Sequence, residues 1–321
     1  MHKVFIDGRA GTTGLRIEEY LGRREDIELI DIDEAKRKDP EARIACIEEA
    51  DVAFLCLPDD GSREIVAALD ERAAAGADSA AARARVIDAS TAHRTADGWV
   101  YGLPELTPEQ RGLIGGASRV AMAGCHAAGF ILLVRPLVDA GIVPPDYPFA
   151  AHSVTGYSGG GKQMIAQYEE SPEVLLEAPR QYALAQRHKH LPEMTMMSGI
   201  SLEPHFSPHV AGYYAGLEMV VPLHRRCVAE GAEAEDVRRA LEERYDGEQF
   251  VRVAGEGADP ESGFLSAGAM AGRNDMEIFV LGNEERILLT ARYDNLGKGA
   301  SGSGVQCMNI MLGLPESDGL L

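Results

Sequence analysis

A glycine-rich segment near the N-terminus constrains the fold most strongly. Gly8-Arg9-Ala10-Gly11-Thr12-Thr13-Gly14 directly follows the short apolar run Lys3 to Asp7, and Leu15 to Leu21 then has helical spacing. Glycines at a strand-to-helix turn let the backbone bend tightly and approach a pyrophosphate, whose charge the helix N-terminus stabilises. The spacing is G-x-x-G-x-x-G instead of G-x-G-x-x-G, so a purely structural turn is the alternative to dinucleotide binding.

The chain then changes its pattern of strands and helices at about residue 125. Before it, strands are predicted at 28–32, 52–57 and 85–88 and a helix at 62–72, an alternation that indicates a parallel sheet with crossover helices. After it, a helix is predicted at 130–138, strands at 149–155, 216–221, 249–253, 277–281 and 286–291, a Gly/Ser-rich turn at 297–304 and a last apolar helix at 305–312. The second half therefore favours a mostly antiparallel sheet.

The composition excludes several partners. Lys and Arg number 31 and Asp and Glu number 51, which gives a formal net charge of −20. Because nucleic acids and anionic membranes bind basic surfaces, we expect neither as a partner. No apolar run approaches the ~20 residues that span a bilayer, and the N-terminus has no signal-peptide pattern. Five scattered cysteines without a C-x-x-C pair favour a reducing, cytoplasmic location.

The second strand carries opposing indications about the nucleotide. It ends in Asp31-Ile32-Asp33, and Lys36-Arg37-Lys38 follows. An acidic residue at this point suits a ribose 2′-hydroxyl, whereas basic residues suit a 2′-phosphate. These residues by themselves leave NAD and NADP both open.

Cys125 is the candidate nucleophile. It lies in Gly124-Cys125-His126-Ala127-Ala128-Gly129, directly before the predicted apolar helix. The positive field of a helix N-terminus favours the thiolate, and the flanking glycines permit a ligand to come close. A buried, inert cysteine is the alternative. That alternative is our expectation for four cysteines inside apolar or helical runs: Cys46, Cys56, Cys227 and Cys307.

A histidine motif supplies the acid/base group that thiolate chemistry needs. His188-Lys189-His190-Leu191-Pro192-Glu193 offers two imidazoles that titrate near neutrality, and Glu193 could orient a ring. The alternatives are a solvated surface segment or a metal site completed by His205 and His209.

Three further motifs could meet phosphate or an amide. Gly156 to Gln163 is a near P-loop, but Gln163 stands where Mg²⁺ needs Ser or Thr, so NTP hydrolysis is disfavoured. Arg94, after Asp88-Ala89-Ser90, offers a bidentate fork for phosphate or carboxylate. Asn295 could bind a carboxamide, or it could simply cap a turn.

Taken together, these blocks resemble N-acetyl-γ-glutamyl-phosphate reductase of the shorter type, one of the aspartate-semialdehyde-dehydrogenase-like reductases. The matching stretches run in family order from residue 4 to about 313: VFIDGRAGTTGL, VIDASTAHR, WVYGLPEL, TGYSGGGK, HKHLPEM and ARYDNLGKGASG. The resemblance implies an α/β protein with a Rossmann-type parallel-sheet domain and an α+β catalytic domain. The implied boundaries are 1–123, completed by a C-terminal helix at 296–321, and 124–295 for the catalytic and oligomerisation domain.

The resemblance also implies a reaction and its residues. Cys125 would attack the acyl phosphate, phosphate would leave, and NADPH would reduce the thioester to N-acetylglutamate semialdehyde, with His190 as the acid/base. Substrate contacts are expected from Arg94, His188, Glu193, Ser158 and Lys162. Cofactor contacts are expected from Gly8, Gly11, Thr12, Thr13, Gly14, Ser90, Gly159, Gly160, Asn295 and Lys298. No metal is expected. A homo-oligomer, either a dimer or a tetramer, is expected.

One segment departs from the family pattern Asn-Pro-Gly-Cys-Tyr-x-Thr-Gly. Here Met122, Ala123, His126 and Ala128 replace its Asn, Pro, Tyr and Thr. One hypothesis is that His126 adds to the field at the thiolate. The change also leaves open another acyl phosphate, of aspartyl or aminoadipyl type, or a non-catalytic NADP-binding protein. Whether His188 or His190 is the acid/base also stays open.

Overall fold

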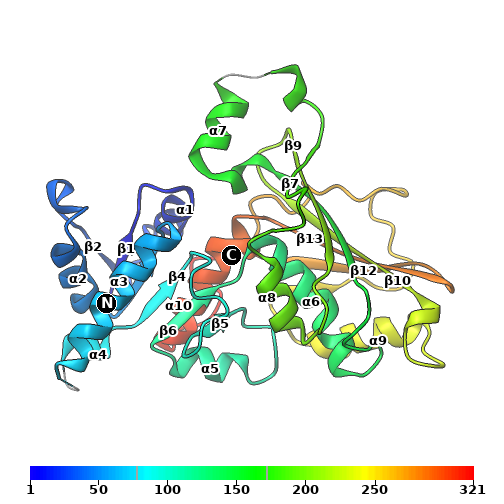
Figure 1. Ribbon diagram of the computed structural model, residues 1–321, viewed down its shortest axis with the longest axis horizontal. Coiled ribbons are helices and arrows are strands. Elements are labelled where there is room, and N and C mark those ends of the chain that lie inside the picture. The colour runs from blue at the N-terminus through cyan, green and yellow to red at the C-terminus, as the bar shows by residue number, and fades with distance from the viewer. Residues whose placement is uncertain (77–78, 171–172) are drawn as a thin grey trace. The chain divides into compact units, whose positions relative to one another are not determined.

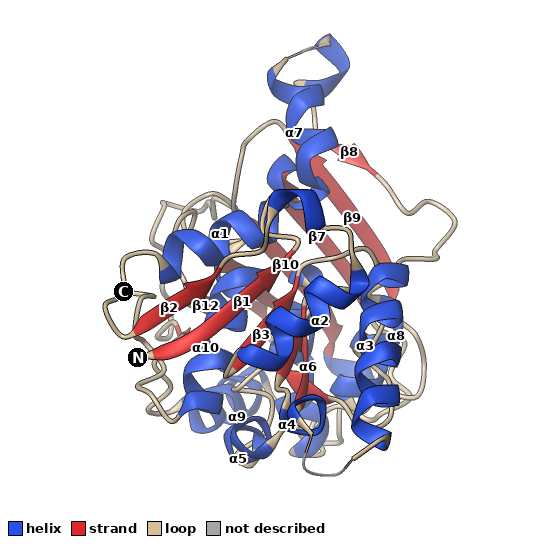
Figure 2. Cartoon of the chain, turned by 90° about the vertical axis from the view of Figure 1, so that its left-hand side faces the viewer, coloured by secondary structure: helices blue, strands red, loops and turns tan. Residues whose placement is uncertain are grey.

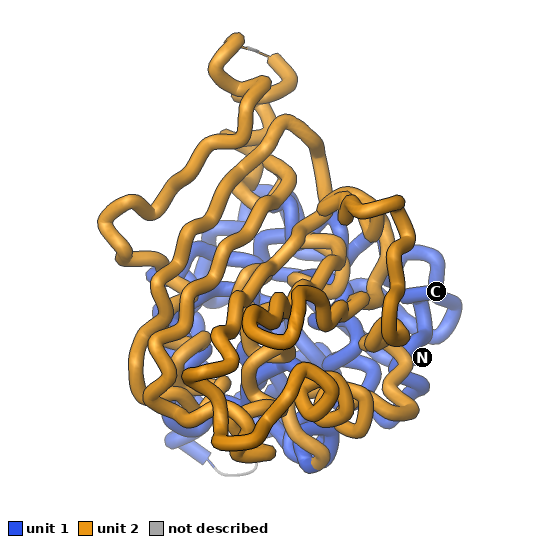
Figure 3. The backbone as a smooth tube through the Cα atoms, turned by 90° about the vertical axis from the view of Figure 1, so that its right-hand side faces the viewer, with its two compact units in different colours: residues 1–104, 109–123, 300–321 blue, residues 105–108, 124–299 orange. Residues whose placement is uncertain are grey.

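The computed structural model describes residues 1–76, 79–170 and 173–321, which divide into two compact units (Figure 3). Unit 1 contains residues 1–104, 109–123 and 300–321. Unit 2 contains residues 105–108 and 124–299. Each unit is built on its own sheet (Figures 1 and 2).

Unit 1 has a six-stranded, fully parallel sheet in the order β2-β1-β3-β4-β6-β5. Its strands are β1 (His2–Asp7), β2 (Ile27–Ile30), β3 (Val52–Leu55), β4 (Val86–Asp88), β5 (Val100–Gly102) and β6 (Arg119–Met122). Its helices are α1 (Thr12–Leu21), α2 (Pro40–Glu49), α3 (Asp59–Ala74), α4 (Ala80–Arg83), α5 (Gln110–Gly116) and α10 (Gly302–Leu312).

Helices cover both faces of this sheet, which explains why its strands are apolar runs without alternation. All four residues of β3 are buried. Phe5 and Leu55 pack in one cluster with Ile44 of α2 and Ile65 of α3. On α10, Gly304 lies so close to β6 and β3 that a Cβ there would come within 2.9 Å of Met122 and 3.4 Å of Phe54.

Unit 2 has a seven-stranded mixed sheet in the order β11-β12-β13-β10-β7-β9-β8. Only the β11–β12 and β7–β9 pairs are parallel. The strands are β7 (Ala150–Gly156), β8 (Arg180–Gln181), β9 (His205–Ala211), β10 (Leu217–His224), β11 (Val251–Val253), β12 (Met276–Asn283) and β13 (Arg286–Tyr293). The helices are α6 (Cys125–Asp139), α7 (Gly161–Glu169), α8 (Leu191–Ser198) and α9 (Ala234–Tyr245). The predicted fold class, a parallel-sheet domain and a mostly antiparallel one, is confirmed.

Helix α6 is the central helix of unit 2. It contacts α8, α9, β10 and β13. Because neighbours surround it, its residues from His126 to Val134 are all buried, and its sequence is apolar on every side. The helix begins at Cys125, five residues before the predicted start at 130, so the candidate nucleophile is its first residue.

The predicted turn at 297–304 is wrong. The chain forms a π-helix at Gly297–Ser301 that continues directly into α10. Glycine has poor helix propensity, but here burial decides, since Lys298 and Ser301 are almost fully buried. The Asp294 carboxylate accepts hydrogen bonds from the Leu296 N–H (2.7 Å) and Gly297 N–H (2.9 Å) and so satisfies the start of this segment. The C-terminal helix also covers only part of the predicted 296–321, because α10 ends at Leu312.

Candidate active site

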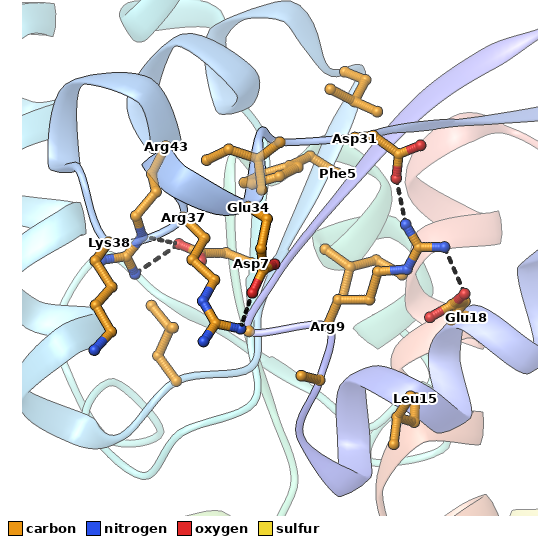
Figure 4. Close-up of a pocket in the computed structure, with 16 residues that line it drawn as sticks. Phe5, Asp7, Arg9, Leu15, Glu18, Asp31, Glu34, Arg37, Lys38 and Arg43 are labelled. Atoms are coloured by element: carbon orange, nitrogen blue, oxygen red, sulfur yellow. Dashed lines mark hydrogen bonds and ion pairs between the residues drawn. The ribbon is translucent and has the colours of Figure 1, made fainter.

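A pocket of about 660 Å³ lies in unit 1 at the carboxyl ends of β1 and β2 (Figure 4). The glycine-rich turn forms one wall. Gly8 has φ +81°, and a Cβ on it would lie 2.2 Å from the Cys56 carbonyl oxygen. A Cβ on Gly14 would lie 2.7 Å from the Gly8 oxygen. Only glycine fits at either position, so the turn has the close backbone approach that a pyrophosphate cradle requires.

The start of α1 suits an anion. Gly11, its N-cap, supplies no side-chain cap, so first-turn N–H groups stay available to a ligand. The Thr12 hydroxyl is buried and has no hydrogen-bond partner. The carbonyl oxygen of Thr13 accepts a 3.3 Å hydrogen bond from the Ser301 hydroxyl. These residues fit the diphosphate of a dinucleotide.

Charged side chains line the opposite wall of the pocket. Figure 4 shows Arg37, Lys38 and Arg43 across from Arg9. Arg9 forms ion pairs with Glu18 and with Asp31, the residue that follows β2. Arg43 forms a buried ion pair with Asp7 at 2.7 Å.

The loop after β4 is internally bonded. The Asp88 carboxylate accepts hydrogen bonds from Ser62 Oγ (2.8 Å) and Ser90 Oγ (2.7 Å). It also contacts His93 Nδ1 at 2.6 Å. Arg94 is 9% exposed and donates to the Ala89 carbonyl oxygen at 3.2 Å. Ser90 and Arg94 therefore shape this loop, and their contacts with cofactor or substrate stay predictions.

In unit 2, Glu193 connects the segment before the nucleophile with the histidine motif. Its Oε2 accepts a 3.0 Å hydrogen bond from the Gly124 N–H, and its Oε1 lies 3.9 Å from His190 Nε2. The side chain is 1% exposed. This geometry fits the expectation that Glu193 orients a histidine ring, and its contact with substrate stays a prediction.

The two motif histidines differ in their hydrogen bonding. His188 Nδ1 accepts a 3.1 Å hydrogen bond from the backbone N–H of His190, so this nitrogen carries no proton. The neutral ring of His188 therefore carries its proton on Nε2 and is a donor there. The rings of His188 and His190 pack edge to face, with centroids 4.6 Å apart.

His126 joins this cluster from the other side. Its ring lies 5.7 Å from the rings of both His188 and His190. Nε2 lies 2.6 Å from the Tyr182 hydroxyl, and Nδ1 lies 3.0 Å from Ser153 Oγ. Tyr182 was missed in the sequence, although it stands six residues before His188 in the same segment.

The hypothesis that His126 adds charge at the thiolate is wrong. Burial, with smaller contributions from His188 and Lys189, lowers the pKa of His126 to about 3. The ring is therefore neutral at physiological pH. Burial, and secondarily Cys125, also raises the pKa of Tyr182, so its hydroxyl keeps its proton and can donate to His126.

The same pKa predicts a loss of stability in acid. The pKa of His126 falls from 6.5 in the unfolded chain to about 3 on folding, so the unfolded state takes up the proton first. The stability that His126 contributes is present above pH 6.5 and is lost as the pH falls from 6.5 towards 3. Between pH 7 and pH 5 we expect a loss of about 2 kcal/mol from this residue. Urea unfolding of wild type and His126→Gln at both pH values measures it, because glutamine does not titrate. Equal losses in the two proteins would contradict it.

A second cluster in unit 2 holds the predicted amide and glycine residues. Asn295 is 1% exposed; its Oδ1 accepts from the Gly216 N–H (2.8 Å) and its Nδ2 donates to Ser158 Oγ (3.0 Å). Gly159 packs on Asn295, since a Cβ there would lie 3.2 Å from Nδ2. Asn295 thus fastens the turn that contains Ser158, Gly159 and Gly160. Its contact with a nicotinamide stays a prediction.

The two lysines predicted in the site differ greatly. Lys162 lies on α7 and is exposed. The Lys298 side chain is 0% exposed and forms a 2.7 Å ion pair with Glu105, which is equally buried. Glu105 was not singled out in the sequence, although it belongs to the WVYGLPEL stretch. Removing one partner of such a pair would leave a buried charge, and the contact of Lys298 with the cofactor stays a prediction.

The remaining expectations concern metals, cysteines and membranes. Within the described ranges, no group of three or more His, Cys, Asp or Glu could hold a metal ion, so the structure does not support the alternative metal site. All five cysteines are free. Cys307 is buried as expected, Cys46 and Cys56 are half-buried, and Cys227 is exposed because it lies in the short surface helix Arg225–Cys227, which corrects its predicted burial. Over residues 1–76, 79–170 and 173–321, no helix is long and apolar enough to cross a membrane.

Comparison with known proteins places this geometry in a class. The NAD-binding domain of semialdehyde dehydrogenases matches residues 3–113, and their dimerisation domain matches residues 125–295. Among solved structures, aspartate semialdehyde dehydrogenase II of Vibrio cholerae, complexed with ASA, superposes with a TM-score of 0.70 at 16% identity, covering 97% of this chain and 98% of that one. The chain is thus an oxidoreductase of the semialdehyde dehydrogenase class, with an NAD(P)-binding domain.

Curated relatives define the family within this class. The "N-acetyl-gamma-glutamyl-phosphate reductase 2" of Nostoc sp. is 44% identical over 329 aligned positions, covering 99% of both chains. The protein of the same name in Pseudomonas putida is 42% identical and covers 98% of both. The chain belongs to the N-acetyl-γ-glutamyl-phosphate reductase family, and the resemblance seen in the sequence is confirmed.

Proposed function

We propose that the protein reduces N-acetyl-γ-glutamyl phosphate to N-acetylglutamate semialdehyde and inorganic phosphate with NADPH, as a step of arginine biosynthesis. The observation that carries the proposal is the pair of contacts made by Glu193. This side chain accepts a hydrogen bond from the N–H of Gly124, which precedes Cys125, and it also lies next to His190. It holds a cysteine at a helix N-terminus next to a histidine cluster, in a chain 44% identical to reductases of this name.

In the proposed reaction, the Cys125 thiolate attacks the γ-carbonyl carbon, the bond from that carbon to the bridging oxygen breaks, and inorganic phosphate leaves with this oxygen. Bound NADPH supplies a hydride to the carbonyl carbon of the resulting thioester. His190 gives a proton to the oxygen that becomes negative and takes it back when the C–S bond breaks, releasing the aldehyde and the thiolate. His188, a donor at Nε2, hydrogen-bonds the carbonyl oxygen, and the contacts expected of Arg94 and of Lys162 with phosphate stay predictions.

This reaction is tested in the reverse direction. Purified protein, NADP⁺, phosphate and N-acetylglutamate semialdehyde should give NADPH, and omitting phosphate should stop turnover. Aspartate semialdehyde under the same conditions separates the two acyl classes. Faster turnover of aspartate semialdehyde would overturn the N-acetylglutamyl assignment, whereas no turnover of either by folded protein would favour a non-catalytic nucleotide-binding protein.

We infer NADP as the cofactor because the basic residues Arg37 and Lys38 line one wall of the pocket, whose lining has four basic and four acidic side chains in all. Asp31, the residue that would suit a ribose 2′-hydroxyl, is already paired with Arg9. Arg37 and Lys38 line the opposite wall, and Arg37 is paired only with the exposed Glu34. A 2′-phosphate would gain charge-assisted hydrogen bonds there.

Replacing Arg37 by alanine should therefore raise the KM for NADP⁺ by about 10- to 100-fold, the worth of one charge-assisted hydrogen bond. The KM for NAD⁺ should change less than about twofold, because NAD⁺ has no 2′-phosphate. Steady-state kinetics with both nucleotides measures this, with the neighbouring exposed Lys36→Ala as the control. A parallel rise for both nucleotides would contradict the assignment.

We further infer a cytoplasmic homo-oligomer. The five free cysteines support a reducing compartment. Residues 125–295 match a dimerisation domain, which supports assembly through unit 2. Light scattering of the purified protein distinguishes monomer, dimer and tetramer.

A further inference from the structure

Tyr293 has no part in the reaction proposed above, yet its hydroxyl contacts the nucleophile's own backbone. It is the last residue of β13, the strand that lies between β12 and β10, and its side chain is fully buried. The hydroxyl donates a 2.6 Å hydrogen bond to the carbonyl oxygen of Cys125. It also accepts a 3.1 Å hydrogen bond from the N–H of Gly129. These two backbone groups face each other across the first turn of α6.

Two glycines make room for this ring. A Cβ on Gly129 would lie 2.5 Å from the Tyr293 hydroxyl oxygen and 2.7 Å from a ring carbon. A Cβ on Gly299, in the π-helix, would lie 3.1 Å from Cys125 Cβ and 3.3 Å from the Tyr293 ring. The tyrosine thus occupies the space that a side chain at position 129 would take, and the π-helix packs directly against Cys125.

The hydroxyl is a permanent donor. Burial, and secondarily Cys125, raises the pKa of Tyr293 well above its usual value, so the phenol keeps its proton throughout the pH range of the enzyme. A donor on the Cys125 carbonyl draws electron density from the peptide that joins Cys125 to His126, and bonds in such a chain strengthen one another. That peptide's N–H belongs to the first turn of α6, where no side chain caps the helix. The positive field that favours a thiolate at this end comes from these N–H groups, and the buried Glu193 carboxylate on the Gly124 N–H opposes it.

We propose that Tyr293 is a positioning residue for the nucleophile: its hydroxyl fixes the first turn of α6 and strengthens the field that keeps Cys125 as a reactive thiolate. The proposal rests on the proposed function, because it takes Cys125 as the nucleophile. Tyr293 touches neither substrate nor cofactor in this role. It acts through the backbone of residues 125 to 129.

The same helix supplies a matched control. The Tyr245 hydroxyl donates a 2.6 Å hydrogen bond to the carbonyl oxygen of Leu132, and Tyr245 is also buried. Tyr293→Phe and Tyr245→Phe each remove one buried hydroxyl from a carbonyl of α6. Only the first removes it from the turn that contains Cys125, where the Gly129 N–H also loses the hydroxyl as its acceptor.

The test is the rate of Cys125 alkylation by iodoacetamide between pH 5 and 9.5, read by mass spectrometry of the Cys125 peptide. Tyr293→Phe should move the midpoint of the profile up by about half a pH unit and slow alkylation at pH 7 about threefold, the size of a helix-terminus field effect. The kcat should fall by a similar factor, whereas KM should change by less than about twofold. Tyr245→Phe should match wild type in all three.

Coinciding alkylation profiles of the two variants would overturn the proposal. If Tyr293→Phe does not fold, Gly299→Ala, which presses on both Cys125 and Tyr293, should slow alkylation in the same direction, and an unchanged rate would also overturn it. Failure of the proposed function is distinguishable, because it appears in wild type as missing phosphate-dependent turnover, whatever the alkylation profiles show.

Discussion

Replacing Cys125 by serine should abolish phosphate-dependent reduction of NADP⁺, lowering kcat/KM at least about a thousandfold. The reaction needs an ionised nucleophile that forms a thioester. A serine hydroxyl stays protonated near neutral pH. An ester would be a poorer hydride acceptor than a thioester, and a serine alkoxide would be a poorer leaving group than a thiolate. Turnover with N-acetylglutamate semialdehyde, and the acyl-enzyme burst in rapid mixing, are the measurements.

Cys227→Ser is the matched control for this experiment. Cys227 belongs to the same unit, is also a free thiol and is exposed on a surface turn. Its replacement should leave kcat and KM within about twofold of wild type, the range expected of a surface change. Retention of more than about a tenth of the activity by Cys125→Ser would mean that another group forms the covalent intermediate or that none is formed.

Replacing His190 by alanine should lower kcat about 10²- to 10⁴-fold and remove one limb of the pH–rate profile, because the variant loses its general acid/base. His190 Nε2 lies 3.9 Å from the buried Glu193 carboxylate, which would stabilise the protonated ring. His188 differs, because its Nδ1 already accepts a backbone hydrogen bond, which it would have to give up to take a proton there.

The comparison of the two histidines decides between them. His188→Ala should lose less activity than His190→Ala and should keep the pH limb. Lys189→Ala, exposed and placed between the two histidines, is the control for disturbing this segment. If His188→Ala lost this limb of the pH–rate profile and His190→Ala kept it, His188 would be the general acid/base instead of His190.

Local features of this protein could be predicted from the sequence. The glycine-rich turn follows from the backbone itself, since Gly8 needs φ +81° and neither Gly8 nor Gly14 has space for a Cβ. Nine of the strands follow from short apolar runs and alternation, whereas β5, β6, β8 and β9 were not predicted. Cys125 stood out because glycines and an apolar helical run surround it, and the structure makes it the first residue of α6.

Other local expectations failed where burial overrides intrinsic preference. The Gly/Ser-rich stretch from Gly297 reads as a turn but forms a helix, because buried packing outweighs the poor helix propensity of glycine. His126 reads as a cation near the thiolate but is neutral, because burial makes its charged form too costly. Neither result is visible in the residue types alone.

The sequence by itself determined the fold class, the family and the chemical groups of the reaction, because these depend on residue types at short spacing. Only the tertiary structure decided which groups act on one another. Glu193 reaches Gly124 across 69 positions, and Tyr293 reaches Cys125 across 168. Hydrogen bonds act over about 3 Å. Partners so far apart in the chain are therefore set by how α6, α8 and β13 pack, and by nothing in the spacing of the residues.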